Sequence, residues 1–89
     1  MVENKNMGNL KDILTKVQSF QSRIKHYGVT MTIDYSIGYD GHRSIDVYVH
    51  SDPEHCERFV FSSFGEDADW EVQMIYLKEH LKEIKAFKE

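Results

Sequence analysis

The sequence has few of the residues that build secreted scaffolds, flexible linkers or membrane anchors. Its 89 residues include one cysteine, Cys56, and one proline, Pro53. A single thiol cannot form an internal disulfide, on which small secreted domains usually depend, so we expect a cytoplasmic protein. The first residues lack the apolar segment of a signal peptide, and no stretch approaches the roughly 18 apolar residues of a membrane-spanning helix.

Motifs for enzymatic chemistry are also missing from the sequence. The chain contains no Gly-rich phosphate loop, no HExxH zinc motif and no recognisable Ser-His-Asp order. Its five glycines are explained by turns and helix caps. We therefore expect a protein that is not an enzyme and that needs no cofactor.

Two regions of helical periodicity flank a region of strand periodicity. Apolar residues at alternating three- and four-residue spacing predict a helix over Leu10–Tyr27, with Asn9 as its N-cap and Gly28 as its C′ glycine. The same spacing predicts a second helix over Asp67–Phe87. The expected buried stripes are Leu10, Ile13, Leu14, Val17, Phe20, Ile24 and Tyr27 in the first helix, and Trp70, Met74, Leu77, Leu81 and Ile84 in the second.

The middle of the chain alternates between apolar and polar residues, which predicts strands over Val29–Ile37, Arg43–His50 and Glu57–Phe64. Asp52-Pro53 marks the second turn. Connections this short exclude a crossover, so we expect an α+β fold in the order α-β-β-β-α, an antiparallel meander with both helices on one face. It would form a single domain over residues 9–89 behind a frayed tail of residues 1–8. The expected inward residues are Val29, Met31, Ile33, Tyr35, Ile37, Ile45, Val47, Val49, Phe59 and Phe61.

The first hairpin can be placed in register from the sequence. A one-residue slip would bury the polar face, so Tyr35 must lie opposite Ile45. This register leaves a three-residue loop, 39–41, whose last position needs a left-handed conformation that Gly41 supplies. It also places Asp34 directly opposite Asp46, and like charges in facing positions destabilise a sheet.

Acidic residues are concentrated in and around the strands. Between Asp34 and Glu71 lie ten acidic residues and two arginines, a formal charge of −8, although the whole chain carries −4. Carboxylates compete with phosphates for Lys and Arg side chains. Our leading interpretation is an inhibitor that occupies the nucleic-acid-binding surface of a basic partner protein, and that itself binds neither nucleic acid nor a membrane. The predicted partner-binding residues are Asp34, Tyr39, Asp40, Asp46, Tyr48, Glu66, Asp67, Asp69 and Glu71.

The same composition also fits a small adaptor or homodimer, in which the acidic residues only keep the protein in solution. Such a protein would associate through an edge strand or through the open face of the sheet. The two interpretations differ in their salt dependence, because only charge-driven binding weakens strongly as ionic strength rises.

Three further possibilities concern metals and the thiol. Asp34 and Asp46 could begin a Mg²⁺ or Ca²⁺ site, but no third ligand follows from the spacing. His50, His55 and Cys56 are residues that zinc prefers, yet no paired zinc motif is present, so we assign no metal. Cys56 could act as a nucleophile only with His50 or His55 as its base.

The element order over residues 9 to 88 resembles that of the double-stranded-RNA-binding domain. In that family a basic cluster opens the last helix and contacts phosphates, whereas the corresponding segment here, 66–71, is acidic. The reversed charge disfavours RNA binding of that kind. Size, element order and acidity together resemble the small phage-encoded anti-CRISPR proteins that act on type II effectors. That resemblance implies competition with nucleic acid for Arg side chains of an effector. The competing carboxylates would be those of Asp40, Glu66, Asp67, Asp69 and Glu71.

Overall fold

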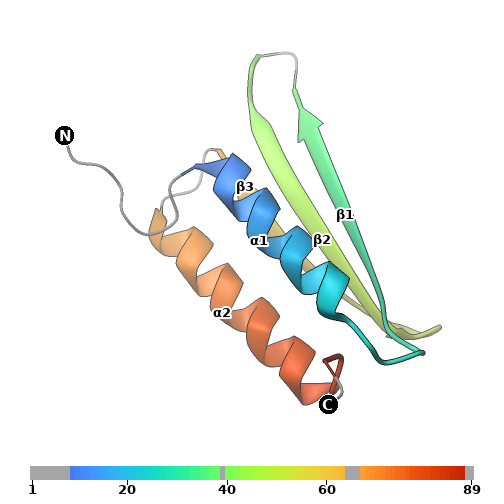
Figure 1. Cartoon of the computed structure of the whole chain (residues 1–89). Helices are drawn as coiled ribbons and strands as arrows, with labels where there is room; N and C mark the ends of the chain where they lie inside the picture. Colours follow the sequence, from blue (N-terminus) through green and yellow to red (C-terminus); the bar gives the residue numbers. More distant parts are fainter. Residues whose placement is uncertain (1–8, 39, 64–66, 88–89) are drawn as a thin grey trace.

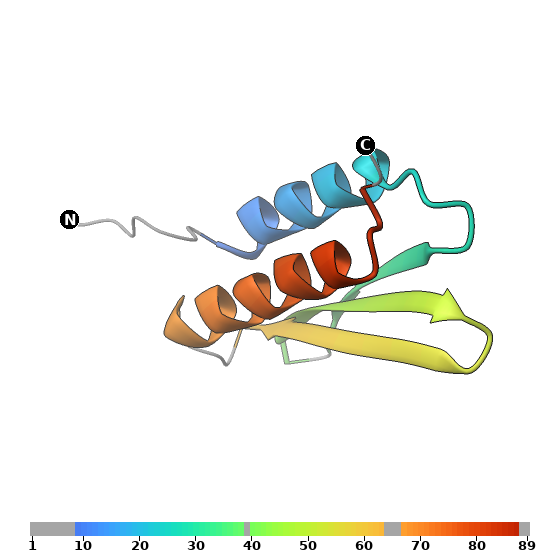
Figure 2. The ribbon, with the colours of Figure 1, turned by 90° about the horizontal axis from the view of Figure 1, so that it is seen from below.

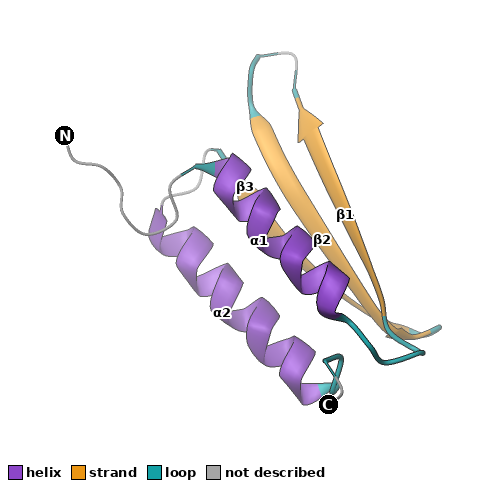
Figure 3. Cartoon of the chain, viewed as in Figure 1, coloured by secondary structure: helices purple, strands orange, loops and turns teal. Residues whose placement is uncertain are grey.

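The part of the chain that the structure describes forms two helices and three strands, in the expected order. The structure, a computed structural model, describes residues 9–38, 40–63 and 67–87, and the expected frayed tail therefore lies outside the described residues. The elements are α1 (Leu10–Arg23), β1 (Thr30–Ile37), β2 (Arg43–Asp52), β3 (His55–Ser62) and α2 (Asp67–Glu83) (Figure 1). The strands form an antiparallel sheet in the order β1-β2-β3, as the short connections predict (Figure 3).

Both helices lie on one side of the sheet, and the hydrophobic core fills the space between the two layers (Figure 2). Alternation along a strand sends every second side chain to the same face, which explains why one face supplies the core. Apart from Tyr27, the predicted helix stripes meet that face, and Leu14, Phe20, Ile24 and Ile84 are only partly buried. The largest side chains without solvent contact are Phe61, Ile13, Ile45, Leu77, Leu81, Val17, Val47 and Val49.

The register predicted for the first hairpin is confirmed. Tyr35 faces Ile45 and Asp34 faces Asp46. The N–H of Gly38 donates to the carbonyl of His42 at 2.6 Å, which closes the loop, and Gly41 has a φ of +87°. Only glycine adopts such a φ without steric cost, so this residue determines the turn.

Helix α1 begins as predicted but ends earlier than predicted. Asn9 and Asp12 form a capping box, in which each side chain accepts a hydrogen bond from the other residue's backbone N–H. The helix ends at Arg23 instead of Tyr27, and Tyr27 is fully exposed. Gly28 is therefore not a C′ residue; it lies in the following turn without a positive φ.

The early end of α1 has a long-range cause. The backbone N–H groups of Lys25 and His26 both donate to the carbonyl of Ala86, at 2.8 and 3.2 Å. Phe87 adds a ring contact to Phe20 at 6.1 Å, and the Arg23 guanidinium lies 4.5 Å from the centre of the Phe87 ring. The segment after α2 therefore replaces the helical hydrogen bonds that a longer α1 would make.

Helix α2 ends at Glu83, before the predicted Phe87, in a Schellman motif. The N–H of Ala86 donates to the carbonyl of Leu81, and the N–H of Lys85 donates to that of Lys82, at 2.9 and 3.0 Å. This geometry places Lys85 in the left-handed region, with a φ of +56°, where glycine is usually found.

The inward face of β1 is only half covered. Met31 is buried, whereas Tyr35 and Ile37 are 42% and 59% exposed, although their register places them on the core face beside Ile45. The far half of the β1–β2 hairpin extends beyond the helices (Figure 1). The prediction that Tyr35 and Ile37 are buried is wrong, because alternation identifies the face but not the reach of the covering helix.

The second hairpin is longer at its turn than predicted. β2 continues to Asp52, and β3 begins at His55 and ends at Ser62. The predicted end of β3, Phe64, lies outside the described residues. Asp52 Oδ1 accepts the backbone N–H of Glu54 at 2.8 Å, and its carboxylate contacts Nδ1 of His55 at 2.7 Å. These two hydrogen bonds, in that order of effect, lower the pKa of the Asp52 carboxyl below its ordinary value of 3.8.

Glutamine side chains close part of each sheet edge. Facing pairs in antiparallel strands alternate between bonded and non-bonded, so every second residue of an edge strand directs its N–H and C=O outward. On β1 the outward carbonyl of Met31 accepts Nε2 of Gln21 at 2.7 Å. On β3 the outward N–H of Val60 donates to Oε1 of Gln73 at 3.3 Å, and the Ser62 carbonyl accepts the Trp70 indole at 2.9 Å.

Candidate protein-binding surface

The open face of the sheet carries a paired acid instead of two opposed free ones. Asp46 accepts a hydrogen bond from the Arg58 guanidinium at 3.3 Å, and Arg58 lies on β3 at the position diagonal to it. The Asp46 carboxylate raises the pKa of Arg58 above its ordinary value. This pair offsets part of the repulsion that the facing positions of Asp34 and Asp46 predict.

Arg58 also lies beside Tyr48, a predicted partner-binding residue that faces it on β2. The guanidinium carbon is 5.9 Å from the Tyr48 ring centre, within the range of a cation–π contact. Tyr48 is half-buried and Asp34 is exposed. Arg58 therefore neutralises one of the two acids on the open face.

The remaining predicted residues belong to the hairpin tip and the start of α2. Asp40 is exposed, and its carboxylate accepts the backbone N–H of His42 at 3.0 Å. Asp69 and Glu71 are exposed near the start of α2. Tyr39 and Glu66 lie outside the described residues, as does the side chain of Asp67. The hairpin tip and the start of α2 lie at the same end of the sheet (Figure 1).

Helix α2 carries a line of acidic and apolar side chains away from the core. Its members recur at alternating three- and four-residue spacing, which places them on one face of the helix over about 21 Å at 1.5 Å per residue. All of them are exposed, and Val72 and Tyr76 are 43% and 57% exposed. We call this line the α2 stripe; it consists of Asp69, Val72, Tyr76, Glu79 and Glu83.

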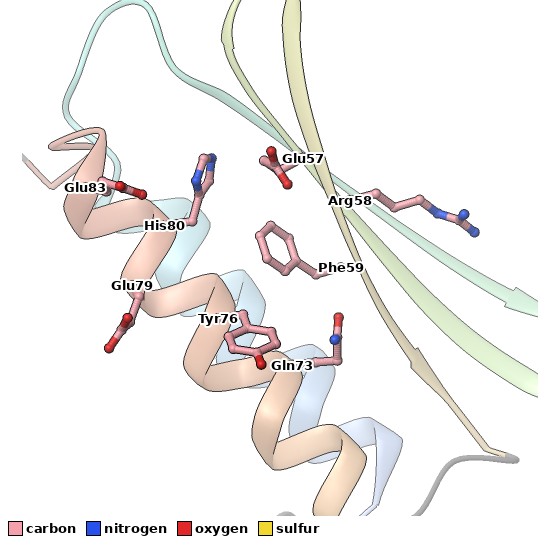
Figure 4. Close-up of a pocket in the computed structure, with 8 residues that line it drawn as sticks. All are labelled: Glu57, Arg58, Phe59, Gln73, Tyr76, Glu79, His80 and Glu83. Atoms are coloured by element: carbon pink, nitrogen blue, oxygen red, sulfur yellow. The ribbon is translucent and has the colours of Figure 1, made fainter.

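A groove of about 420 Å³ lies beside the α2 stripe, between α2 and the edge strand β3 (Figure 4). Three glutamates line it against a single arginine, and aromatic rings provide its apolar surface. Figure 4 shows Glu57 pointing from β3 toward the space in front of the helix, whereas Arg58 points away from α2. The residues that line this acidic groove are Glu57, Arg58, Phe59, Gln73, Tyr76, Glu79, His80 and Glu83.

His80 provides a polar atom inside the acidic groove. Its ring lies 5.9 Å from that of Phe59. Its Nε2 is shielded from solvent and forms no hydrogen bond within the described part of the chain. Shielded polar atoms in folded proteins almost always have a hydrogen-bond partner. The groove surface thus combines carboxylates and aromatic faces, which suit a guest with N–H groups, while Nε2 of His80 lies beneath that surface.

The His and Cys residues singled out from the sequence are only partly brought together. His50 faces Cys56 across β2 and β3, and both side chains are exposed. His55 is instead bonded to Asp52. Among residues 9–38, 40–63 and 67–87, no three His, Cys, Asp or Glu side chains are close enough to hold a metal ion.

Sequence reasoning missed both the α2 stripe and the acidic groove. The stripe leaves a signal in the sequence, because Tyr76, Glu79 and Glu83 repeat at helical spacing on the side opposite Trp70 and Leu77. The groove leaves none, since it depends on where α2 lies relative to β3.

No protein-family model, curated protein or solved structure matches this chain. None of the helices in the described residues is long and apolar enough to cross a membrane.

Proposed function

We propose that this protein is a non-catalytic inhibitor that binds a cationic, nucleic-acid-binding surface of a partner protein. The observation that carries the proposal is that Glu57, Glu79 and Glu83, from two elements, all line one groove with an aromatic wall. A surface that holds nucleic acid presents Lys and Arg side chains, and these bind carboxylates in the same way as phosphates.

The acidic groove suits an arginine or lysine side chain in particular. The guest's charged group would bind the glutamates, and its stem or guanidinium plane would pack on Tyr76 and Phe59. The exposed Val72 and Ile75 on the outer side of α2 would add apolar contact.

The α2 stripe extends this surface toward the start of the helix, where Asp69 belongs to the predicted partner-binding set. Carboxylates spaced along a rigid helix fit a basic surface because they are already held in position. Occupation of such a surface would exclude nucleic acid by direct competition. The resemblance to anti-CRISPR proteins makes an RNA-guided effector nuclease of type II the first partner to test.

The test is capture of partners by the tagged protein from nuclease-treated lysate at low and high salt, identified by mass spectrometry. The expected partner is a nucleic-acid-binding protein that is recovered at low salt and lost at high salt. It should then release labelled nucleic acid in a mobility-shift assay when the protein is added. A stable ternary complex with both ligands bound would contradict the proposal.

Matched charge reversals locate the surface. Glu79→Lys combined with Glu83→Lys reverses the rim of the acidic groove and should abolish capture. Glu54→Lys changes an equally exposed acid in the turn between β2 and β3, and should leave capture intact. Equal capture by the double variant and the control would remove the groove from the mechanism.

A further inference from the structure

We infer that this chain forms a symmetric dimer through the far half of strand β1, in which residues 33–37 of two copies pair antiparallel. The inference is independent of the proposed function, because it concerns the opposite edge of the sheet from the acidic groove. The occupant of the edge is a second copy of the same chain.

The first argument is that this edge segment has unpaired backbone groups. The hydrogen bond from Gly38 to His42 fixes which residues of β1 bond to β2. By alternation, the N–H and C=O groups of Ile33, Tyr35 and Ile37 point away from β2, and they form no hydrogen bond with any described residue. Unpaired edge groups of this kind are a template for another strand.

The second argument is that the remaining edge segments are obstructed. Gln21 occupies the outward carbonyl of Met31, and Gln73 and Trp70 cover the second half of β3. The first half of β3 carries charged or ionisable side chains at its exposed positions, including Glu57 and Arg58, which discourage strand pairing. Residues 33–37 contain one charged residue, Asp34, and no proline.

The third argument is that the segment is complementary to itself in one register. Pairing Tyr35 with Tyr35 of the second copy sets Ile33 opposite Ile37, and each facing pair can exchange two hydrogen bonds. The same register sets Asp34 opposite Ser36, so no like charges face each other. Centring the pair on Asp34 instead would oppose two carboxylates, which is unfavourable.

Registers centred on Ile33 or on Ser36 also form fewer hydrogen-bonded pairs between the two copies. A centre at Ile33 requires the Met31 carbonyl, which Gln21 already occupies. A centre at Ser36 leaves only Tyr35 and Ile37 as facing partners within β1. The Tyr35-centred register is therefore the one that the backbone groups and charges favour together.

Pairing would also cover the apolar side chains that the helices leave exposed. Tyr35 and Ile37 lie on the helix side of the sheet, as the pairing of Tyr35 with the buried Ile45 shows, and a twofold axis perpendicular to the sheet brings both copies of each onto one continuous surface. The result is a six-stranded sheet with all four helices on one face. Five residues per copy make an interface at the small end of specific contacts, so the dimer should be weak.

The test is sedimentation equilibrium of the full chain at loadings from about 20 µM to 1 mM, with no partner present, because interfaces this small dissociate readily. A reversible monomer–dimer equilibrium is expected. Amide hydrogen exchange should slow with concentration at Ile33, Tyr35 and Ile37, and should not change at Ser36, whose N–H bonds to β2 in either state. A monomer throughout this range would overturn the inference.

Substitutions that place opposite charges at Ser36 test the register, because they should change the affinity of the dimer in opposite directions. Ser36→Lys places an ammonium opposite Asp34 of the second copy and should tighten the dimer by about 2- to 30-fold, since two such pairs form. Ser36→Asp should weaken it by a similar factor. Tyr35→Lys should abolish the dimer, whereas Tyr27→Lys, at a fully exposed site off the edge, should not. Circular dichroism of each variant establishes that it is folded, and the same sign for both Ser36 variants would exclude this register.

Discussion

Because one residue at the end of α2 has a left-handed backbone, replacing lysine with glycine should change stability in opposite directions at two nearby positions. Lys85 has a φ of +56° at the C′ position, and a non-glycine residue there costs about 1–2 kcal/mol. Lys82 lies in the last turn of the same helix, where glycine costs about 0.7–1 kcal/mol. Replacing each lysine with glycine removes the same charge and adds the same freedom to the unfolded chain.

The two variants should therefore differ in stability only through the effect of each substitution on the folded state. After about 0.4–1 kcal/mol is subtracted for the added unfolded-state entropy, Lys85→Gly should leave stability unchanged or raise it by up to about 1.5 kcal/mol. Lys82→Gly should lower stability by about 1 kcal/mol. The resulting gap of about 1–2.5 kcal/mol corresponds to a difference in Tm of roughly 4–20 °C for a domain of this size.

Trp70 provides the assay, because it is the only tryptophan of the chain and is buried, 8% exposed. Its emission should shift to the red when α2 leaves the sheet, and urea and thermal titrations of the two variants can be compared directly. Equal stability of the two variants, or a lower stability of Lys85→Gly, would refute the assignment of conformational strain to Lys85.

Two further predictions concern the core and the second turn. Leu77→Ala should cost about 2–5 kcal/mol of an expected total of about 4–13 kcal/mol, whereas Ile75→Ala, half exposed on the same helix, should change stability by less than about 1 kcal/mol, as urea unfolding would show. Asp52 has a folded-state pKa below 3.8, so its contribution to stability is complete above that pH and is lost as the pH falls through the folded pKa. Thermal melting between about pH 2.5 and 6 should therefore fall less steeply below pH 3.8 in Asp52→Asn, and an unchanged slope would contradict this assignment.

The features that local sequence determines were predictable. Alternation along β2 identified Ile45, Val47 and Val49 as core residues, and Gly41 fixed the hairpin loop and with it the register. These predictions succeeded because each depends on residues close together in the chain.

The features that sequence analysis missed depend on distant contacts. The end of α1 is determined by the Ala86 carbonyl, more than sixty residues away in the chain. The exposure of Tyr35 and Ile37 depends on where the helices stop along the sheet. Helical spacing therefore indicated a longer helix, and alternation indicated a fuller core, than tertiary packing allows.

The candidate surface shows the same division. The clustering of acidic residues was evident in the sequence. The pairing of Asp46 with Arg58 instead follows from the β2–β3 register, which no turn residue in the sequence determined. The acidic groove requires the position of α2 beside β3, and periodicity carries no information about the placement of one element against another.

The two glutamines at the sheet edges use opposite ends of the same side-chain amide. Gln21 donates through its nitrogen to Met31, whereas Gln73 accepts through its oxygen from Val60. A carboxylate can accept but cannot donate. Deamidation of Gln73 to glutamate would therefore preserve the closure of β3, and deamidation of Gln21 would open β1 along its whole length. Deamidation in a stored sample should therefore affect the two edges unequally. The glutamine hydrogen bond would be lost only at β1, the edge that already has unpaired backbone groups.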